Sequence, residues 1–583
     1  MNPLSDPFRT QIAKQISEQI ENCFQVNLSS SDCESDLAQV PNPKMGHIAF
    51  PCFKLSKSLK TNPKEIAEKL ANSWSDSSST SEVKAVGPYL NFFFKESFFG
   101  ETILSPMIKG DYFKNNKSSA QPYLIEYSQP NTHKELHVGH MRNLCFGHSL
   151  ILLFDYCGNN VVSCTFPGDV GTHVAKCLWY LKFHNQEPVP EKNKGQWLGT
   201  MYSSAHNKLE DEKGTDKEDQ NRTQLTEILR QIEKKEGEFF DLWKETREWS
   251  LELMNEVYKW AGVSFDKWYW ESDVDSDSVK LIKDLHQQGK LVEDNGALGL
   301  NLEDEKLGFA MFLKSDGNGL YSTKDLELAR RKFAEYDPQK NIVVVDMRQE
   351  LHFSQVFTAF DKLGLGDKDR CLHLKYNFVE LPDGAMSSRK GNIIPITELI
   401  ENMKTVIKTE YLARYNDEWT QDDIDFTADA VAQGAIKYGM NKMDPNKKIV
   451  FDMKEWLRLD GESGPYIQYA HARICSLMSK FKELQKDDVN WGLLNHESEK
   501  ALMVHLSLFN WAMYKALENY KTSGICNYIY DLAKLFNTFY HDCPIGKIDD
   551  DELKSSRLAL AHSTQKALSK GLELIGVPAP QKM

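Results

Sequence analysis

Residues 123–142 read YLIEYSQPNTHKELHVGHMR, and this stretch decides the fold that we expect for the centre of the chain. Its first five residues are apolar or aromatic apart from Glu126, which is typical of a buried strand. Pro130 breaks that strand, and an apolar pattern with helical spacing begins at Met141. The stretch therefore predicts a strand, a polar loop and a helix.

Two histidines and a glycine occupy the predicted junction between strand and helix. Open α/β sheets bind ligands at the carboxyl ends of their strands, and the free N–H groups at a helix start favour a phosphate there. Gly139 leaves room for a ligand, and His137 and His140 can donate hydrogen bonds to phosphate oxygens. The tetrapeptide alone is weak evidence, because a chain of 583 residues can contain one by chance.

A second loop with phosphate-binding character follows a predicted strand at residues 376–381. Residues 381–392 read LPDGAMSSRKGN, which is rich in glycine, hydroxyl groups and positive charge. Such a loop can close over a phosphate chain while Arg389 and Lys390 neutralise the charge on it. An incidental surface turn is the alternative for this loop taken alone, and the histidine motif makes that alternative weaker.

Composition narrows the class of protein. At 583 residues the chain is too long for one hydrophobic core, and about three domains are expected. No apolar run approaches the roughly 20 residues that span a bilayer. The 11 cysteines form no Cys-x-x-Cys pair, which predicts reduced thiols and a cytoplasmic location. A net charge of −14 argues against a general nucleic-acid coat protein but does not exclude a local basic face.

The order of the predicted elements gives an α/β fold with three domains. Residues 1–112 form a small α+β module. Residues 121–407 alternate strands and helices, which predicts a Rossmann-type doubly wound parallel sheet. Residues 185–248 are strongly charged and interrupt that alternation as an insertion, which we expect to be mostly solvated surface. Residues 408–583 carry almost no strand signal and predict an all-α bundle.

The two loops resemble, in the same order, the two ATP-handling motifs of class I aminoacyl-tRNA synthetases. More specifically, the chain resembles the arginyl-tRNA synthetases nearly end to end. The matching stretches are residues 126–142, 168–172 (GDVGT), 316–325 (DGNGLYSTKD), 345–353 (VDMRQELHF), 386–392 (MSSRKGN) and 464–473 (GPYIQYAHAR).

The resemblance implies a ligase that joins L-arginine to its tRNA with ATP, through arginyl-adenylate and transfer to the terminal adenosine. It implies ATP with Mg²⁺, and we expect no protein-held metal site. The residues it assigns to catalysis are His137, His140, Lys134, Arg389 and Lys390. Those assigned to ATP binding are His137, Gly139, His140, Met386, Ser387 and Ser388. Those assigned to arginine are Glu126, Tyr321 and Asp325 at the guanidinium, with Asn131 and Gln349 at the other end.

The chemistry of an arginine side chain agrees with part of this assignment. A guanidinium needs carboxylate acceptors in a fixed geometry. A buried Glu126 would require a cationic partner, which is either the substrate or a Lys or Arg of the protein. Tyr321 and Asp325 are four residues apart on a predicted helix, so they share a face and can grip one ligand.

The second loop departs from the family pattern at two positions. The usual loop carries lysines at its first and fourth positions, where this chain has Ala385 and Ser388. In relatives of this kind a lysine just before the histidine motif is thought to compensate, and Lys134 occupies that place. We therefore expect Lys134, Arg389 and Lys390 to share the phosphate charge.

The flanking domains would hold tRNA. Tyr466, Tyr469, His471 and Arg473 lie on one predicted helix of the bundle, where they can stack on bases and contact phosphates, although each tyrosine is equally compatible with a core position. The N-terminal module resembles the family's domain that contacts the tRNA elbow. We expect a monomer, because no long apolar stripe is left for a partner.

Two other functions remain open from the sequence. A small-molecule nucleotidyltransferase would use the same histidine motif but would leave about half of the chain unexplained. A catalytically impaired paralogue that binds RNA is compatible with the altered second loop. The intact residues of the two sites argue against it, namely Glu126, His137, His140, Asp325 and Gln349.

Overall fold

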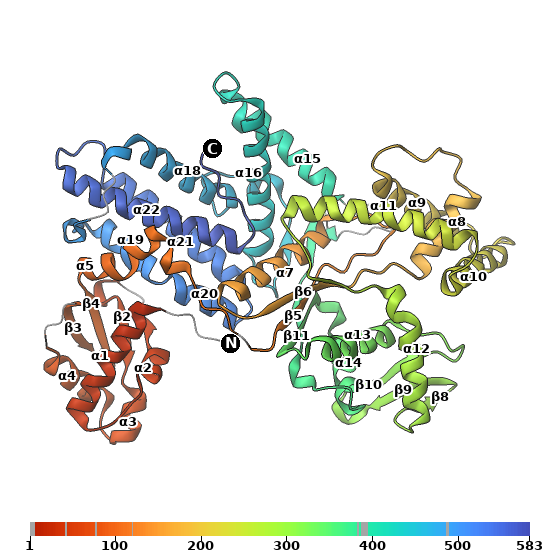
Figure 1. Ribbon diagram of the computed structural model, residues 1–583, viewed down its shortest axis with the longest axis horizontal. Coiled ribbons are helices and arrows are strands. Elements are labelled where there is room, and N and C mark those ends of the chain that lie inside the picture. The colour runs from red at the N-terminus through yellow and green to blue at the C-terminus, as the bar shows by residue number, and fades with distance from the viewer. Residues whose placement is uncertain are drawn as a thin grey trace.

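The protein is described by a computed structural model that covers residues 6–40, 43–75, 79–118, 120–381, 384–385, 394–484 and 489–583. Figure 1 shows an elongated molecule with the N-terminal module and the C-terminal helices at one end and the central sheet with its insertion towards the other. None of the helices in these ranges has both the length and the apolar character that a membrane span requires.

A parallel sheet of five strands forms the centre of the molecule. Its strands, in spatial order, are β12 (Cys371–Tyr376), β11 (Lys340–Asp346), β5 (Tyr123–Glu126), β6 (Val161–Thr165) and β7 (Lys267–Trp268). From β5 the chain builds β6 and β7 on one side and β11 and β12 on the other. The strand order thus reverses at β5, which confirms the predicted doubly wound α/β fold and places its switch point between β5 and β11.

Helices cover both faces of this sheet (Figure 1). The helix α7 (Val138–Tyr156) packs on β5, β6 and β11, and α14 (Glu350–Lys362) packs on β12 and on α13 (Tyr321–Tyr336). Every residue of β5 is buried as a result, which explains its nearly continuous apolar sequence. The helix α7 begins three residues before the predicted start at Met141, because side chains of the histidine motif cap its first turn.

Two strands that continue the predicted alternation lie outside the parallel sheet. They are β9 (Ala297–Leu302) and β10 (Gly308–Leu313), which form an antiparallel sheet with β8 (Val292–Asp294). The link between β9 and β10 is only residues 303–307, and a parallel connection needs a dozen or more residues. The prediction of alternating strands and helices is therefore confirmed, but the prediction that these two strands belong to the parallel sheet is wrong.

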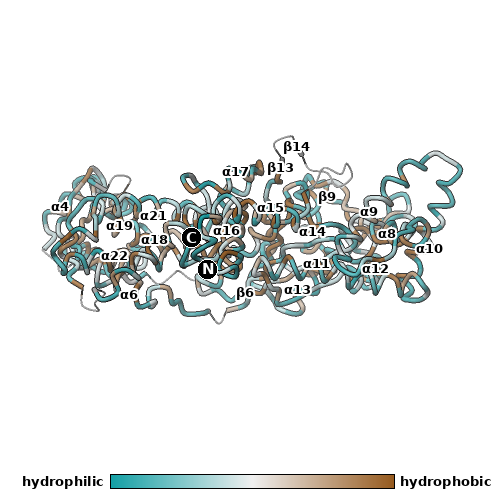
Figure 2. Tube along the Cα trace, turned by 90° about the horizontal axis from the view of Figure 1, so that it is seen from above, coloured by the Kyte–Doolittle hydropathy of each residue, from teal (hydrophilic) through white to brown (hydrophobic). Residues whose placement is uncertain are grey.

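The insertion is less solvated than its charge suggested. It consists of α9 (Lys194–Asp211), α10 (Glu218–Lys234) and α11 (Glu238–Ala261), which follow α8 (Thr172–Phe183). The trace around α9 and α10 is largely hydrophilic (Figure 2). Even so, Trp179 of α8 and Trp243 of α11 are buried in one apolar cluster with residues of α9 and α10. The charged faces are exposed, and the helices enclose a small core of their own.

The two outer regions follow the predicted classes. The N-terminal module is a four-stranded antiparallel sheet with helices, in the order α1 (Pro7–Phe24), α2 (Ser30–Asp36), β1 (Ala38–Gln39), β2 (Ile48–Pro51), α3 (Phe53–Leu59), α4 (Pro63–Ser73), β3 (Thr80–Val86) and β4 (Tyr89–Phe94). The short helices α5 (Glu96–Phe99) and α6 (Ser105–Lys109) then contact the C-terminal bundle.

The C-terminal region is helical. After α15 (Ile396–Val406), which lies within the predicted limits of the central domain, its helices are α16 (Gln421–Asn441), α17 (Met453–Trp456), α18 (Gly464–Lys480), α19 (Glu497–Ser507), α20 (Phe509–Glu518), α21 (Ser523–Asp542) and α22 (Asp551–Leu574). The short strands β13 (Val379–Leu381), β14 (Gly384–Ala385) and β15 (Ile449–Val450) form a small separate sheet. The helices α19 and α20 meet at Leu508.

At Gly147 of α7, side-chain packing and helix propensity have opposite effects on stability. A Cβ at Gly147 would lie 2.2 Å from the ring carbon Cγ of the buried Tyr127. Alanine gains about 1 kcal/mol of helix propensity over glycine, whereas overpacking costs about 1–3 kcal/mol, so Gly147→Ala should lower the free energy of unfolding by about 1 kcal/mol. Chemical denaturation measures this change. At Gly492 the nearest atom to a new Cβ lies at 3.4 Å, so Gly492→Ala is the control; a more stable Gly147→Ala variant would contradict this account.

Candidate active site

A cleft of ≈ 670 Å³ opens at the carboxyl ends of β5 and β11, where the strand order reverses. Glu126 ends β5 and Asp346 ends β11, and both line the cleft. The walls come from the loop after β5, the start of α7, the start of α13 and the segment after β11. The predicted ligand site of a doubly wound sheet is therefore a real depression in this protein.

The cleft collects most of the residues that the sequence analysis assigned to ATP or arginine. The assigned residues that line it are Glu126, Asn131, His137, Gly139, His140, Tyr321, Asp325 and Gln349. Lys134 lies outside this lining, half-buried, with its ammonium 5.1 Å from the ring centre of Tyr202 in the insertion. Met386, Ser387, Ser388, Arg389 and Lys390 lie outside the described residues.

The two histidines are held by hydrogen bonds from the backbone. Nδ1 of His137 accepts from the N–H of Gly139 at 3.2 Å, and Nδ1 of His140 accepts from the N–H of His137 at 3.1 Å. A ring nitrogen that accepts carries no proton, so in a neutral ring the proton is on Nε2. Both imidazoles therefore have an Nε2–H donor left for a ligand.

Burial keeps both rings neutral. It lowers the pKa of His137 to about 4 and the pKa of His140 well below its ordinary value, and the positive charge of Lys134 acts in the same direction. At neutral pH the pair donates hydrogen bonds but carries no full positive charge. Charge neutralisation of a phosphate must then come from other groups, such as lysines or arginines.

The segment that follows the second predicted loop is hydrogen-bonded beside the histidines. The N–H of Val138 donates to the carbonyl of Ile394 at 3.1 Å, and the N–H of Ile396 donates to the carbonyl of Leu136 at 2.9 Å. Ile394 is the first described residue after the basic loop. The segment that begins at Ile394 thus adjoins the histidine motif, although 246 residues separate His140 from Met386 in the sequence.

Glu126 has a protein cation as its partner. Its Oε2 accepts a short hydrogen bond from the ammonium of Lys332 on α13, and its Oε1 accepts from Nε2 of Gln129 at 3.0 Å. Both charged side chains are buried. The sequence left either the substrate or a Lys or Arg of the protein as the cationic partner of Glu126, and in the structure this partner is Lys332. Lys332 was missed, although a lysine four residues after Leu328 on the apolar face of a helix is a signal of such a partner.

The predicted pair on α13 faces the cleft. Tyr321 is 70% exposed, so its ring is available to a ligand, and Asp325 lies one turn later on the same helix. Asp325 accepts from Nε2 of His352 at 2.5 Å. The carboxylate is thereby oriented by a histidine that the sequence analysis did not single out.

Glu271 is a further acidic residue of the cleft that the sequence analysis missed. It is the first residue of α12 (Glu271–Gln287), and its side chain lies 3.4 Å from the ammonium of Lys324. Burial raises the pKa of Glu271 to about 7, and Lys324 offsets only part of that rise. The signal available in the sequence was weak, since Glu271 follows the aromatic run 268–270 and belongs to no recognised motif.

The residues assigned to tRNA form a cluster on α18, away from the cleft. The guanidinium of Arg473 bonds Oδ1 of Asn537 at 2.9 Å and lies 4.8 Å from the ring centre of Tyr469. The hydroxyl of Tyr466 accepts from Asn537 at 2.9 Å. These three side chains are half-buried, whereas His471 is buried against the carbonyl of Pro580 and was wrongly grouped with them.

Potential metal ligands are not gathered into one site anywhere in the described part of the chain. No group of three or more His, Cys, Asp or Glu side chains there is arranged to hold a metal ion. The four acidic residues that line the cleft have protein partners instead, namely Lys332, Lys324, His352 and Arg348.

Comparison with known protein families finds three matches along the chain. Residues 10–94 match the family described as arginyl tRNA synthetase N terminal domain. Residues 102–453 match tRNA synthetases class I (R), catalytic domain, and residues 467–583 match the DALR anticodon binding domain. The first loop and the cleft fall within the second of these matches.

Similar proteins and structures agree with these families. The chain is 54% identical over 556 residues to the arginine–tRNA ligase of Bdellovibrio bacteriovorus, with 95% of each chain covered. It is 32% identical to that of Halothermothrix orenii, covering 99% of this chain and 100% of the relative. The arginyl-tRNA synthetase of Thermus thermophilus has the same fold, with a TM-score of 0.80 at 24% identity over 99% of this chain and 100% of that one.

The pair beneath the cleft can be tested by removing its cation. Lys332→Met leaves the buried carboxylate of Glu126 without a charged partner, which should cost about 3–5 kcal/mol in the free energy of unfolding. Denaturant titration measures the loss, and Lys332→Met combined with Glu126→Gln should recover much of it. The exposed pair of Lys114 and Asp111 supplies the control, since Lys114→Met should change stability little. Equal effects of the two lysine variants would contradict the structural role of Lys332.

Proposed function

The chain belongs to the class I arginyl-tRNA synthetases, and from that premise we propose how its cleft activates arginine and how its outer domains hold tRNA. Its activity is that of an arginine–tRNA ligase, which charges tRNA with arginine. Neither a small-molecule nucleotidyltransferase nor an impaired RNA-binding paralogue is supported. The observation that carries the site proposal is the cleft itself, which has neutral histidine donors on one side and carboxylates on the other.

We assign the α7 side of the cleft to ATP. His137 and His140 would each donate an Nε2–H to phosphate oxygens, and Gly139 would let the nucleotide approach the backbone of the helix start. Because these rings are neutral, the growing negative charge needs cations. We propose that Lys134, Arg389 and Lys390 supply them, with Met386, Ser387 and Ser388 closing over the nucleotide.

The α13 side of the cleft is assigned to arginine. Asp325 and Glu271 would accept the guanidinium hydrogen bonds, and the exposed ring of Tyr321 would cover its face. Glu126 contributes less net charge than the sequence suggested, because Lys332 neutralises it, and we assign it a hydrogen-bonding role at the floor. Asn131 and Gln349 would bind the α-amino and carboxylate groups.

Catalysis in this arrangement depends on positioning. With both substrates held, an oxygen of the arginine carboxylate attacks the α-phosphorus of ATP, and pyrophosphate leaves. Holding the reacting atoms in line lowers the entropic cost of the reaction, and the donors at the start of α7 stabilise charge on the phosphates. The hydroxyl of the terminal adenosine of tRNA then attacks the arginyl carbonyl, and AMP leaves. We propose that Mg²⁺ enters bound to the ATP phosphates.

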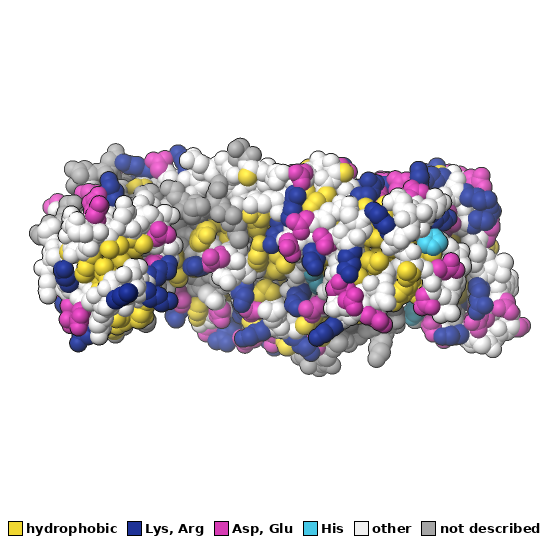
Figure 3. All heavy atoms as spheres, turned by 90° about the horizontal axis from the view of Figure 1, so that it is seen from below, with side chains coloured by type: hydrophobic (Ala, Val, Ile, Leu, Met, Phe, Trp, Pro, Cys, Tyr) yellow, Lys and Arg dark blue, Asp and Glu magenta, His cyan; other side chains and the backbone are white. Residues whose placement is uncertain are grey.

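The outer regions are assigned to tRNA. On α18 we propose Tyr466, Tyr469 and Arg473 as contacts to the anticodon stem and loop, because they are half-buried and cluster on one helix. On the N-terminal module, which we assign to the tRNA elbow, hydrophobic side chains gather on one face (Figure 3). Phe53 and Tyr89 of this module are exposed, with ring centres 5.6 Å apart, and offer a surface for stacking.

We propose three domains with the limits 1–112, 121–407 and 408–583. All eleven cysteines are free, which supports a cytoplasmic location. A monomer is the proposed state in solution.

Asp325 gives the most selective test of the arginine site. Asp325→Ala removes a carboxylate acceptor of the guanidinium, so we expect the KM for arginine to rise about 100-fold, since a lost charge pair costs 2–5 kcal/mol or more. The KM for ATP should change little. ATP–pyrophosphate exchange measures both, with each amino acid and with and without tRNA.

Asp277 of α12, which pairs with Arg331 and does not line the cleft, supplies the control variant Asp277→Ala. Exchange by the unaltered protein with another amino acid only, or no exchange even with tRNA, would refute the proposed site. Equal rises in both KM values for Asp325→Ala would place this carboxylate outside the arginine pocket.

Glu271 should make arginine binding depend on pH. In the empty protein its carboxyl is half protonated near pH 7, and a guanidinium favours the ionised form. Binding below pH 7 must therefore release a proton, so affinity for arginine should fall by up to about tenfold per pH unit between pH 7 and pH 6. Calorimetric titration in two buffers measures the affinity and the proton released. Glu271→Gln should flatten the dependence; an unchanged slope in that variant would assign the pH effect to another group.

A further inference from the structure

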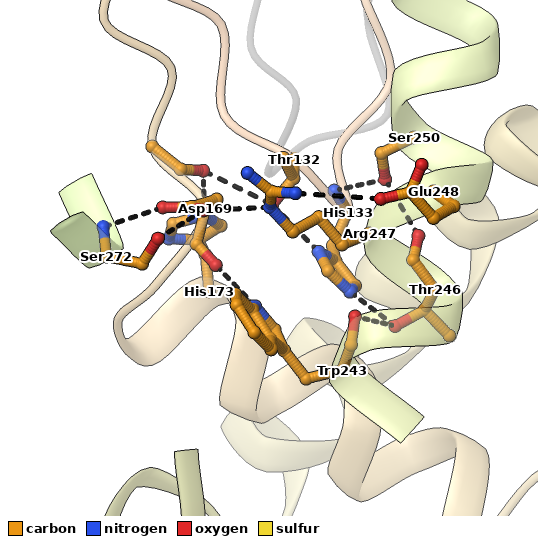
Figure 4. Close-up of polar contacts among 11 residues, drawn as sticks. Thr132, His133, Asp169, His173, Trp243, Thr246, Arg247, Glu248, Ser250 and Ser272 are labelled. Atoms are coloured by element: carbon orange, nitrogen blue, oxygen red, sulfur yellow. Dashed lines mark hydrogen bonds and ion pairs between the residues drawn. The ribbon is translucent and has the colours of Figure 1, made fainter. Parts of the chain in front are cut away.

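Asp169 is a buried residue in the loop that leads from β6 to α8 (Figure 4). Its carboxylate accepts three hydrogen bonds: from Nε of Arg247 at 2.9 Å, from the hydroxyl of Ser272 at 2.7 Å and from the backbone N–H of Ser272 at 2.9 Å. Its backbone carbonyl accepts from the indole N–H of Trp243 at 2.7 Å. One fully buried residue thus joins the sheet, the insertion and the start of α12.

The hydrogen bonds to Ser272 fix the neighbouring Glu271. The helix α12 begins at Glu271, and its own N-cap residue, Trp270, makes no side-chain hydrogen bond to the first turn. Asp169 supplies that acceptor from a different segment, and a carboxylate at a helix start is favoured by the helix dipole. The orientation of the Glu271 side chain in the cleft therefore depends on a residue that does not line the cleft.

The residue before Asp169 touches the same pocket. Gly168 lines the cleft, and its carbonyl accepts from the N–H of Thr132 at 2.9 Å. A Cβ at Gly168 would lie 2.4 Å from Oδ1 of Asn131 and 3.6 Å from the carboxyl carbon of Glu271. Asn131 and Glu271, which we propose to bind arginine, thus lie on either side of Gly168. A shift of the loop at Gly168 would therefore move both side chains.

Arg247 holds Asp169 from the insertion. It lies on α11, and its guanidinium carbon is 4.0 Å from the ring centre of Trp270, the residue before Glu271. The same guanidinium lies 5.6 Å from the ring centre of Trp243. Arg247 therefore combines an ion pair with stacking on an aromatic ring, a combination that lysine cannot reproduce.

The helix α11 also supports the loop after β5 (Figure 4). The backbone N–H of His133 donates to the hydroxyl of Ser250 at 2.9 Å, and Nε2 of His133 bonds the hydroxyl of Thr246 at 2.8 Å. His133 has a φ of +60°, a left-handed conformation that costs free energy for a residue other than glycine. Contacts with α11 offset that cost, so α11 braces the segment that carries Asn131.

We propose that Asp169 and Arg247 are positioning residues of the arginine pocket. They hold the first turn of α12 and the loop at Gly168, and through these they keep Glu271 and Asn131 at the spacing that binds arginine. This inference rests on the proposed assignment of the cleft to arginine. It gives the insertion a role in substrate binding although none of its helices supplies a residue that lines the cleft.

Kinetics of the variant Arg247→Met test the inference. Loss of a hydrogen bond to a charged group should raise the KM for arginine about tenfold, and the KM for ATP should change less than about threefold. The milder variant Ser272→Ala, which keeps the backbone N–H, should raise the KM for arginine by about threefold. Arg230→Met is the matched control, because Arg230 makes a bidentate pair with Glu227 on α10 and does not line the cleft, and it should change neither KM.

A double-mutant cycle separates positioning from general destabilisation. If Arg247 acts through Glu271, Arg247→Met should raise the KM for arginine much less in a Glu271→Gln background than in the unaltered protein. Three outcomes would overturn the inference while leaving the proposed function intact. The first is that the two substitutions raise the KM for arginine by independent factors that multiply. The others are equal rises in the KM values for arginine and ATP, or an unchanged KM for arginine in folded Arg247→Met and Ser272→Ala. An unaltered protein without arginine-dependent exchange would overturn the proposed function and this inference with it.

Discussion

The parallel pairing of β5 with both β6 and β11 is the constraint on which the rest of the structure depends. The chain leaves β5 towards one side of the sheet and returns later on the other, so the segments that follow β5 and β11 diverge. A depression at their carboxyl ends is the geometric consequence. The start of α7 forms one wall and the start of α13 the other, and the buried pair of Glu126 and Lys332 ties β5 to α13 beneath the floor.

Charge is distributed unequally across this cleft, and the distribution fits a cationic substrate beside a nucleotide. The α7 wall carries two neutral imidazoles, which can donate hydrogen bonds to phosphate oxygens although they have no positive charge. The α13 wall carries Asp325, with Glu271 and its partner Lys324 beside it. A pocket built to pair a guanidinium rejects analogues that lack it, because its own carboxylates would then be left without partners. On the proposed assignment of the α13 wall, selectivity for arginine would arise in the binding step.

Local patterns in the sequence were enough to predict the secondary-structure elements and motifs of this protein. They were not enough to predict side-chain contacts between segments that are distant in the sequence. The strand at β5, the histidine motif, and the shared face of Tyr321 and Asp325 depend on neighbouring residues, and they were predicted correctly. The Lys332 partner of Glu126 is 206 residues away, and the acceptor that orients Ser272 is 103 residues away. Such contacts depend on tertiary packing, which the spacing of residues along the chain does not encode.

The most direct measurement is a crystal structure of the protein with a non-hydrolysable analogue of arginyl-adenylate. We expect the guanidinium within hydrogen-bonding distance of both Asp325 and Glu271, and the phosphate analogue within reach of Nε2 of His137 and His140. Glu126 should remain paired with Lys332 when the analogue is bound. A guanidinium held at another site, or phosphate density away from the start of α7, would contradict the assignment of the two walls.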